Sequence, residues 1–330
     1  TARPERQIEL DGALSLAEPE QWQGKTEIAL DYRLQSYSSL SMGHTVAGGF
    51  SPRTADKVDE WLQRPSDGRE PMETPTPFNF PRGADAGTAL HQVFEELEFN
   101  RLPEEGAAAF EPDQKQVVEK ALNDYDIDPD RWGPVAGQMV RATAQTPFSA
   151  AGDAPKLAGV AEEKCSNELE FYVRVGQDTL ASVRSRISGD LRRDHSRMLA
   201  QPNDRELFIH RGYIWGYIDL VFEHGGRYYI VDYKSNHLGD EYDDYAPDKL
   251  LQAMVERDYT LQYYLYTLAL HRILKQRLGD SYDYEKHMGG AAYLFLRGIQ
   301  PGYARQPSPT GIYFHRPSAE VIDSMDAMLK

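Results

Sequence analysis

Cysteines, long apolar runs and basic residues are scarce in this sequence of 330 residues, and each scarcity excludes some classes of protein. A single cysteine, Cys165, excludes an intrachain disulfide framework and any four-cysteine zinc or iron–sulfur site. We therefore expect a reducing, cytoplasmic setting. No apolar run approaches the roughly 18 residues that a membrane span requires, so we expect no membrane role.

Basic residues are also scarce. The chain has 36 Lys and Arg against 52 Asp and Glu, a formal net charge of −16. This balance argues against a protein that holds nucleic acid by bulk electrostatics, because such binding needs clustered Lys and Arg. It does not exclude a metal-dependent nuclease, because carboxylates are the ligands such a site needs. A nuclease of this charge would need a local basic groove or a partner subunit to guide DNA.

The start of the chain, "TARPERQIELDG", has neither an initiator Met nor the basic and apolar segments of a signal peptide. We interpret the chain as part of a longer polypeptide. Residues 1–30 are polar and irregular and are predicted to be a linker. Residues 31–330 are predicted to form the folded domain, which is long enough to bury a sizeable core.

Hydrophobic patterning predicts both helices and strands after the linker. The segment 87–99 is predicted to be a helix, because Leu90, Val93, Phe94 and Leu97 recur at helical spacing, with Thr88 as its cap. Further helices are expected up to about residue 148, as one long helix over 247–277, and over 318–330. Strands are expected in 28–41, 167–175, 207–236, 289–298 and 311–315. This order predicts an α/β domain with a mixed sheet.

The stretch "GYIDLVFEHGGRYYIVDYKSNHLG" (216–239) reads as two apolar strands around a turn near Gly225. Three charged residues interrupt it: Asp219, Asp232 and Lys234. Residues two apart share one face of a strand, so Asp232 and Lys234 point the same way. The turn puts Asp219 diagonally opposite Asp232, about 7–8 Å away between backbones.

Two carboxylates at that separation can bind one divalent cation. Mg²⁺ prefers hard oxygen ligands, and beside a phosphate it supports hydrolysis. The alternative is that Asp232 and Lys234 form a surface ion pair, and spacing alone leaves both interpretations open. His91, with Glu95 one turn later, is either a packed core residue or a ligand. Glu168 is either an exposed strand residue or part of the site.

Several longer strings resemble the RecB family of nuclease domains, found at the C-terminus of the beta subunit of RecBCD helicase–nucleases (exodeoxyribonuclease V). They are "SYSSL", "FPRGADAGTALHQVFEELEF", "ELEF", the stretch 216–239, "YTLQYYLYTLALHR", "GGAAYLFLRG" and "GIYFHRP". They occur in this order over about residues 30–330. The resemblance implies a PD-(D/E)XK, restriction-endonuclease-like fold, with a central mixed sheet flanked by helices.

The resemblance also implies a role for individual residues. It implies that Mg²⁺, which Ca²⁺ can replace, is held by His91, Asp219, Asp232 and the backbone carbonyl of Tyr233. It implies that the residues of the catalytic step are Asp219, Asp232, Lys234 and Glu168. It implies that Gln262 and Tyr266 support the active site or bind DNA. Ile218 stands where the family's name has Pro, a substitution that is usual in the family.

The function implied by the resemblance is Mg²⁺-dependent hydrolysis of phosphodiester bonds in unwound DNA strands, during double-strand break repair and recombination. RecC-like and RecD-like subunits would be its partners. The single cysteine excludes the related branch that holds an iron–sulfur cluster. Two alternatives remain: a non-catalytic scaffold of the RecC type, which lacks the acidic residues, and a stand-alone nuclease of the same superfamily.

Overall fold

A computed structural model describes residues 33–36, 74–102, 110–149, 154–175, 179–194, 212–300 and 309–329. All of them belong to the part of the chain that was expected to fold. The linker predicted over 1–30 lies outside the described residues, and the boundary after residue 30 stays a prediction.

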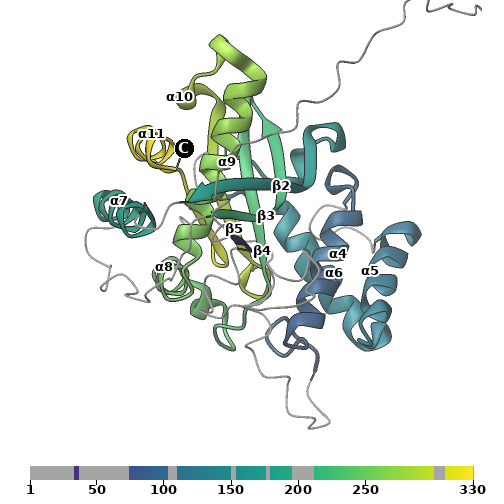
Figure 1. Cartoon of the computed structure of the whole chain (residues 1–330). Helices are drawn as coiled ribbons and strands as arrows, with labels where there is room; N and C mark the ends of the chain where they lie inside the picture. Colours follow the sequence, from purple (N-terminus) through teal and green to yellow (C-terminus); the bar gives the residue numbers. More distant parts are fainter. Residues whose placement is uncertain are drawn as a thin grey trace, which may run out of the picture. The chain divides into compact units, whose positions relative to one another are not determined.

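One mixed sheet runs through the described part of the chain (Figure 1). Its strands are β1 (Arg33–Ser36), β2 (Cys165–Val175), β3 (Gly212–His224), β4 (Arg227–Lys234), β5 (Met288–Phe295) and β6 (Ile312–His315). The order is β1-β3-β4-β5-β6, and β2 pairs with the other edge of β3. The pairs β1–β3 and β4–β5 are parallel, and the others are antiparallel. The predicted mixed sheet is confirmed.

Helices lie against both sides of this sheet (Figure 1). One group is α4 (Ala84–Glu96), α5 (Pro112–Asp124) and α6 (Pro129–Gln145). The other is α7 (Thr179–Asp194), α8 (Pro247–Glu256), α9 (Tyr259–Leu278) and α11 (Ala319–Met328), with the short α10 (Tyr284–His287) nearby. Each group packs against its own hydrophobic core, so we name the two sides of the sheet the α4 face and the α9 face. Among the described helices, none is long and apolar enough to cross a bilayer.

Two details of the helices differ from the expectation. Thr88 is not the cap of α4: the helix begins four residues earlier, and the Thr88 hydroxyl donates to the Ala84 carbonyl inside it. The long helix predicted over 247–277 is two helices, α8 and α9. The break falls at Asp258, whose φ of 62° lies in the left-handed region and ends the helical path.

Helix α7 was not predicted, although its pattern was visible. Val183, Ile187 and Leu191 are buried in the core of the α9 face at a spacing of four residues. A low content of apolar residues around them and a glycine within the helix, Gly189, hide this stripe. Packing against α9 and α11 stabilises this helix, whose own helix propensity is low.

The alternation of side chains along β3 changes phase at Asp219. Ile214 and Ile218 belong to the core of the α9 face, and alternation would put Leu220 there too. Leu220 and Phe222 instead belong to the core of the α4 face. Two consecutive residues, Asp219 and Leu220, therefore turn to the α4 face, which is the geometry of a bulge. This irregularity lies at the first charged residue of the hairpin.

Candidate active site

The site lies where β3 and β4 separate. The β3–β4 hairpin turns at Gly225 and Gly226, whose φ values of 60° and 79° favour glycine. Its ladder ends at the pair Leu220 and Val231. Beyond this pair, the edge of β3 that had paired with β4 pairs with β1. The other edge of β3 is occupied by β2 along residues 212–222. A fork therefore opens between β3 and β4.

Asp219 and Asp232 are the first residues of each strand within this fork. They stand directly opposite rather than diagonally, because the register of the hairpin pairs residue 220 with residue 231. The Tyr233 backbone N–H donates to Asp219 Oδ2 at 2.8 Å, where a β3 carbonyl would otherwise accept. The Asp219 carboxylate therefore completes the broken ladder and is fixed in the fork.

Asp232 and Lys234 form a buried ion pair on the α9 face. The distance from Lys234 Nζ to Asp232 Oδ2 is 2.6 Å, and Asp232 is only 2% exposed. The pair is therefore not a surface ion pair, which was one of the two interpretations. Burial of this kind is costly unless further hydrogen bonds satisfy both groups.

Burial and the neighbouring charges act in opposite directions on the pKa of each member of this pair. Burial raises the pKa of Asp232 most, Lys234 lowers it, and Asp219 raises it further, to about 7 overall. Burial acts to lower the pKa of Lys234, but the Asp232 carboxylate, Tyr259 and Asp219 raise it above its ordinary value. The ion pair therefore favours the charged form of Lys234.

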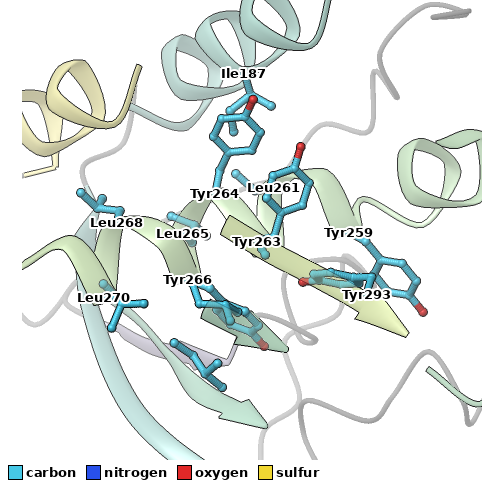
Figure 2. Packing of buried hydrophobic residues seen from close by; sticks show 14 of the residues in the cluster. Ile187, Tyr259, Leu261, Tyr263, Tyr264, Leu265, Tyr266, Leu268, Leu270 and Tyr293 are labelled. Carbon is cyan, nitrogen blue, oxygen red and sulfur yellow. The ribbon is translucent and has the colours of Figure 1, made fainter. Parts of the chain in front are cut away.

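Side chains from α9 and β5 surround the Lys234 ammonium. It lies 4.3 Å from the ring centroid of Tyr259 and 5.3 Å from that of Tyr293. Gln262 Oε1 lies 3.4 Å from Lys234 Nζ and accepts from the Tyr293 hydroxyl at 2.9 Å. Gln262 Nε2 donates to the Tyr266 hydroxyl at 2.8 Å. Figure 2 shows Tyr259 and Tyr263 of α9 beside Tyr293, with Tyr266 farther along the helix. Of the predicted pair, Gln262 thus lies beside Lys234, and Tyr266 contacts Gln262.

His91 reaches the fork from the α4 face. It is buried, and its Nδ1 lies 3.4 Å from Asp219 Oδ2. The ring of Tyr233 meets His91 edge to face at 5.8 Å and stacks on Phe94 at 4.3 Å. His91 is therefore both a packed core residue and a neighbour of the Asp219 carboxylate. The two interpretations left open by the sequence are compatible.

Glu168 lies on the other side of Asp219, in β2. The neighbouring pairs are Asn167 with Leu220 and Leu169 with Ile218, so Glu168 occupies the position opposite Asp219. Its φ of 52° lies in the left-handed region, which is strained for glutamate, and its Oε2 is buried. The bulge of β3 is thus matched by an irregularity of β2 at the same level. Such strain is typical of functional positions.

The donor set of the fork fits a divalent cation such as Mg²⁺. Among the described residues, no three His, Cys, Asp or Glu side chains form a preformed metal-binding group. Magnesium does not need one, because it binds through one or two carboxylates and keeps several waters. Asp219 and Asp232 are the two carboxylates of the fork, and the Asp219 charge acts to raise the pKa of Asp232. A bound cation would relieve that repulsion.

The sequence did not predict three residues that shape this site. Tyr259 and Tyr293 flank Lys234. The position of Tyr293 follows only from the parallel pairing of β4 with β5, in which Tyr293 pairs with Asp232. Arg297 is fully buried, and its guanidinium donates to the carbonyl of Ser235, next to Lys234. The same guanidinium donates to the carbonyls of Pro77, Phe80 and Pro81. It therefore ties the end of β4 to the segment before α4.

Comparison with known proteins identifies the family of this chain. Residues 62–326 match the model of the PD-(D/E)XK nuclease superfamily. The chain is 38% identical over 303 residues to RecBCD enzyme subunit RecB of Escherichia coli K12. It is 30% identical over 313 residues to the same subunit of Haemophilus influenzae and 29% identical over 332 residues to that of Mycobacterium tuberculosis (strain CDC 1551).

These alignments cover 90%, 91% and 90% of this chain. They cover only 23%, 24% and 28% of the respective relatives, so the chain spans about a quarter of their length. The resemblance and the fold class expected from the sequence are both confirmed. The family model covers most of the mixed sheet and the helices on both of its faces, and the chain belongs to the PD-(D/E)XK nuclease superfamily.

Proposed function

We propose that this chain is a Mg²⁺-dependent deoxyribonuclease domain that hydrolyses phosphodiester bonds in unwound single strands of DNA. The observation that carries the proposal is the fork itself. There, Asp219 and Asp232 stand opposite each other beside a buried Lys234, whose charged form Asp232 favours. This is the combination of hard ligands and positive charge that phosphodiester hydrolysis needs.

Asp219, Asp232 and the backbone carbonyl of Tyr233 would hold the cation, with His91 as a further ligand. Bound there, a divalent cation would polarise the scissile phosphate and make a water molecule acidic. The hydrogen bond from the Tyr233 N–H keeps the Asp219 carboxylate directed into the fork. Glu168, opposite Asp219, would complete the acidic side of the site.

Lys234 would act through its charge and not as a base. Its raised pKa keeps the ammonium protonated, so it can stabilise negative charge that develops on the phosphate. Gln262 and the ring of Tyr259 fix the ammonium in place. Tyr266 orients the amide of Gln262 in turn. Gln262 and Tyr266 therefore support the site and need not touch the substrate.

The wider context is proposed from the relatives, whose printed name is that of a subunit of the RecBCD enzyme. By that likeness, the chain would work in the cytoplasm within a helicase–nuclease. RecC-like and RecD-like subunits would bring unwound DNA to it. Its role would be the processing of DNA ends in double-strand break repair and recombination.

The test is cleavage of linear single-stranded DNA by the 330-residue chain with Mg²⁺, and again with EDTA. We expect cleavage that EDTA abolishes. Replacement by alanine at Asp219, Asp232 or Lys234 should reduce the rate about 100-fold or more. Asp280→Ala removes an exposed carboxylate outside the fork and should not change the rate. Full activity in Asp232→Ala would contradict the assignment.

Metal binding separates a nuclease from a scaffold without measuring cleavage. Calorimetric titration with Mg²⁺ or Ca²⁺ should give a binding signal that Asp219→Ala and Asp232→Ala both remove. A chain that binds neither cation, or binds them unchanged in both variants, would instead be a non-catalytic module.

A further inference from the structure

A group of aromatic side chains lies on the α4 face of β2 and β3, away from the helices of that face. Ile214 and Ile218 face the core of the α9 face, so Tyr213, Trp215 and Tyr217 point to the opposite side. Tyr213 is 43% exposed, and Trp215 and Tyr217 are partly exposed.

The neighbouring strand adds a fourth ring to this group. Tyr172 of β2 pairs with Trp215 in the register and is 54% exposed. Within the described part of the chain, Tyr172 and Tyr213 are the large hydrophobic side chains left exposed. We name Tyr172, Tyr213, Trp215 and Tyr217 the aromatic platform.

Contacts with one another and with Glu170 hold the rings of Tyr172, Trp215 and Tyr217 in place. The hydroxyls of Tyr172 and Tyr217 both donate to Glu170 Oε1, at 2.7 Å and 3.2 Å. The rings of Trp215 and Tyr217 meet edge to face at 6.0 Å. The platform is therefore an ordered surface built on strands.

The aromatic platform is continuous with the fork. Tyr213, Trp215, Tyr217 and Asp219 are alternate residues of one strand, about 7 Å apart in turn. Asp219 also turns to the α4 face, where it meets His91. A ligand that lies along the platform therefore reaches the fork at Asp219.

We propose that the aromatic platform binds single-stranded DNA by stacking of its bases, and so guides the strand into the fork. Unpaired bases stack on aromatic side chains whatever their sequence, whereas the bases of a duplex are already stacked. Stacking also does not depend on a positive protein, which matters for a chain of net charge −16. This inference rests on the proposed function and names the surface that holds its substrate.

Charges beside the aromatic platform set the orientation of the strand. Arg174 pairs with Tyr213 in the register and is exposed at the end far from the fork, where it suits a phosphate. Glu170 lies near the fork, opposite Tyr217, and repels phosphates. The sugar–phosphate backbone should therefore run along the edge of the platform, with the bases over the rings.

The test is binding of a fluorescently labelled oligothymidine strand to the 330-residue chain, followed by anisotropy with EDTA present. Tyr213→Leu and Trp215→Leu should each weaken binding about tenfold, and the double variant more. Tyr213→Phe keeps the ring and should bind like the wild type. The factor lost should be the same at about 50 and 200 mM salt, because no phosphate contact is removed.

Tyr172→Leu examines the same surface from β2, so the result does not depend on β3 tolerating a substitution. Circular dichroism of each variant checks its fold. The single-strand cleavage assay is run beside the binding assay. Wild-type cleavage with unchanged binding in all three leucine variants would overturn the platform and leave the nuclease standing. A wild-type chain that neither binds nor cleaves single strands would overturn both.

A change of oligomeric state in the leucine variants, with unchanged DNA binding, would make this face a protein contact. That result would also overturn the proposal.

Discussion

The two faces of the sheet bury cores of different chemistry. The core of the α9 face contains many tyrosines: Tyr245, Tyr259, Tyr263, Tyr264, Tyr266, Tyr284, Tyr293 and Tyr313. Their hydroxyls find partners, as when Tyr264 donates to Asp190 and Tyr284 to the Pro317 carbonyl. The core of the α4 face is built mainly from Phe, Leu, Val and Ala, with Tyr229 and Tyr233 as its tyrosines.

This difference explains where the ion pair can be buried. Asp232 and Lys234 point to the α9 face, where hydroxyls, an amide and aromatic rings replace the water that they lose. On the α4 face the same charges would meet mostly apolar carbon, and their burial would cost more free energy. The tyrosine-rich core is therefore part of the site.

The two cores also differ in how far they extend along β2 and β3. The core of the α9 face runs along β2 and β3 through Phe171, Val173 and Ile214. The core of the α4 face includes β3 only beyond the phase change, at Leu220 and Phe222. Before the phase change, the α4 face of β3 instead carries the side chains of the aromatic platform.

The largest expected effect tests the apolar character of the α4 face. Phe94 is buried and stacks on Tyr233, so Phe94→Ala should leave a cavity and reduce the free energy of unfolding by about 4 kcal/mol. Phe94→Leu fills much of the space and should cost less than half as much. Denaturant unfolding measures both. A loss below about 1 kcal/mol for Phe94→Ala would show that this core does not depend on close packing.

The next effect tests the link that Arg297 makes between the end of β4 and the segment before α4. Its guanidinium satisfies four backbone carbonyls, so Arg297→Met should reduce the free energy of unfolding by about 3 kcal/mol. Arg297→Lys keeps the charge but cannot span the same acceptors, and should recover only part of the loss. The readout is again denaturant unfolding. Wild-type stability in Arg297→Met would mean that the carbonyls find other partners.

Glu168 tests whether strain is stored at the site. Glycine accepts a positive φ without cost, so Glu168→Gly should raise the free energy of unfolding by about 1 kcal/mol. The same variant should cleave DNA more slowly, because it lacks the carboxylate opposite Asp219. Glu168→Gln, which keeps the strain, separates the two effects. A destabilised Glu168→Gly would show that the carboxylate stabilises the fold more than the strain weakens it.

The smallest effect tests the hydroxyls of the α9 face. Tyr293→Phe removes the donor to Gln262 Oε1 and should cost about 0.5–1 kcal/mol of stability. Cleavage should fall modestly, because Gln262 then orients Lys234 less firmly. Tyr284→Phe removes the buried hydroxyl that donates to the Pro317 carbonyl and serves as the control. Equal cleavage rates in Tyr293→Phe and the wild type would restrict the tyrosines to a packing role.

Much of the fold could be predicted from the sequence, because its helices and strands carry clear periodicity. Alternation identified β2, and the His-Gly-Gly turn identified the hairpin of β3 and β4. Helix α7 and the break between α8 and α9 could not be predicted. One depends on packing, and the other on a single backbone conformation at Asp258.

The residues of the candidate site were predicted, but of their arrangement only the shared face of Asp232 and Lys234 was. The hydrogen bond from the Tyr233 N–H to Asp219 requires the ladder to end at Leu220, which no local pattern indicates. The contact of Lys234 with Tyr259 and Tyr293 requires α9 and β5 to meet β4. The catalytic and metal-binding roles of the predicted site residues stay predictions until the cleavage and titration experiments are done.

The sequence by itself determined the apolar strands of the hairpin, its turn, and the shared face of Asp232 and Lys234. These follow from a period of two residues and from the conformational freedom of glycine. Only the tertiary structure decided that β3 changes phase at Asp219, and that this opens a fork facing His91 on one side and the tyrosines of α9 on the other. The physical reason is that these features depend on pairing between segments distant in the chain, and sequence periodicity reports only what neighbours along one segment do.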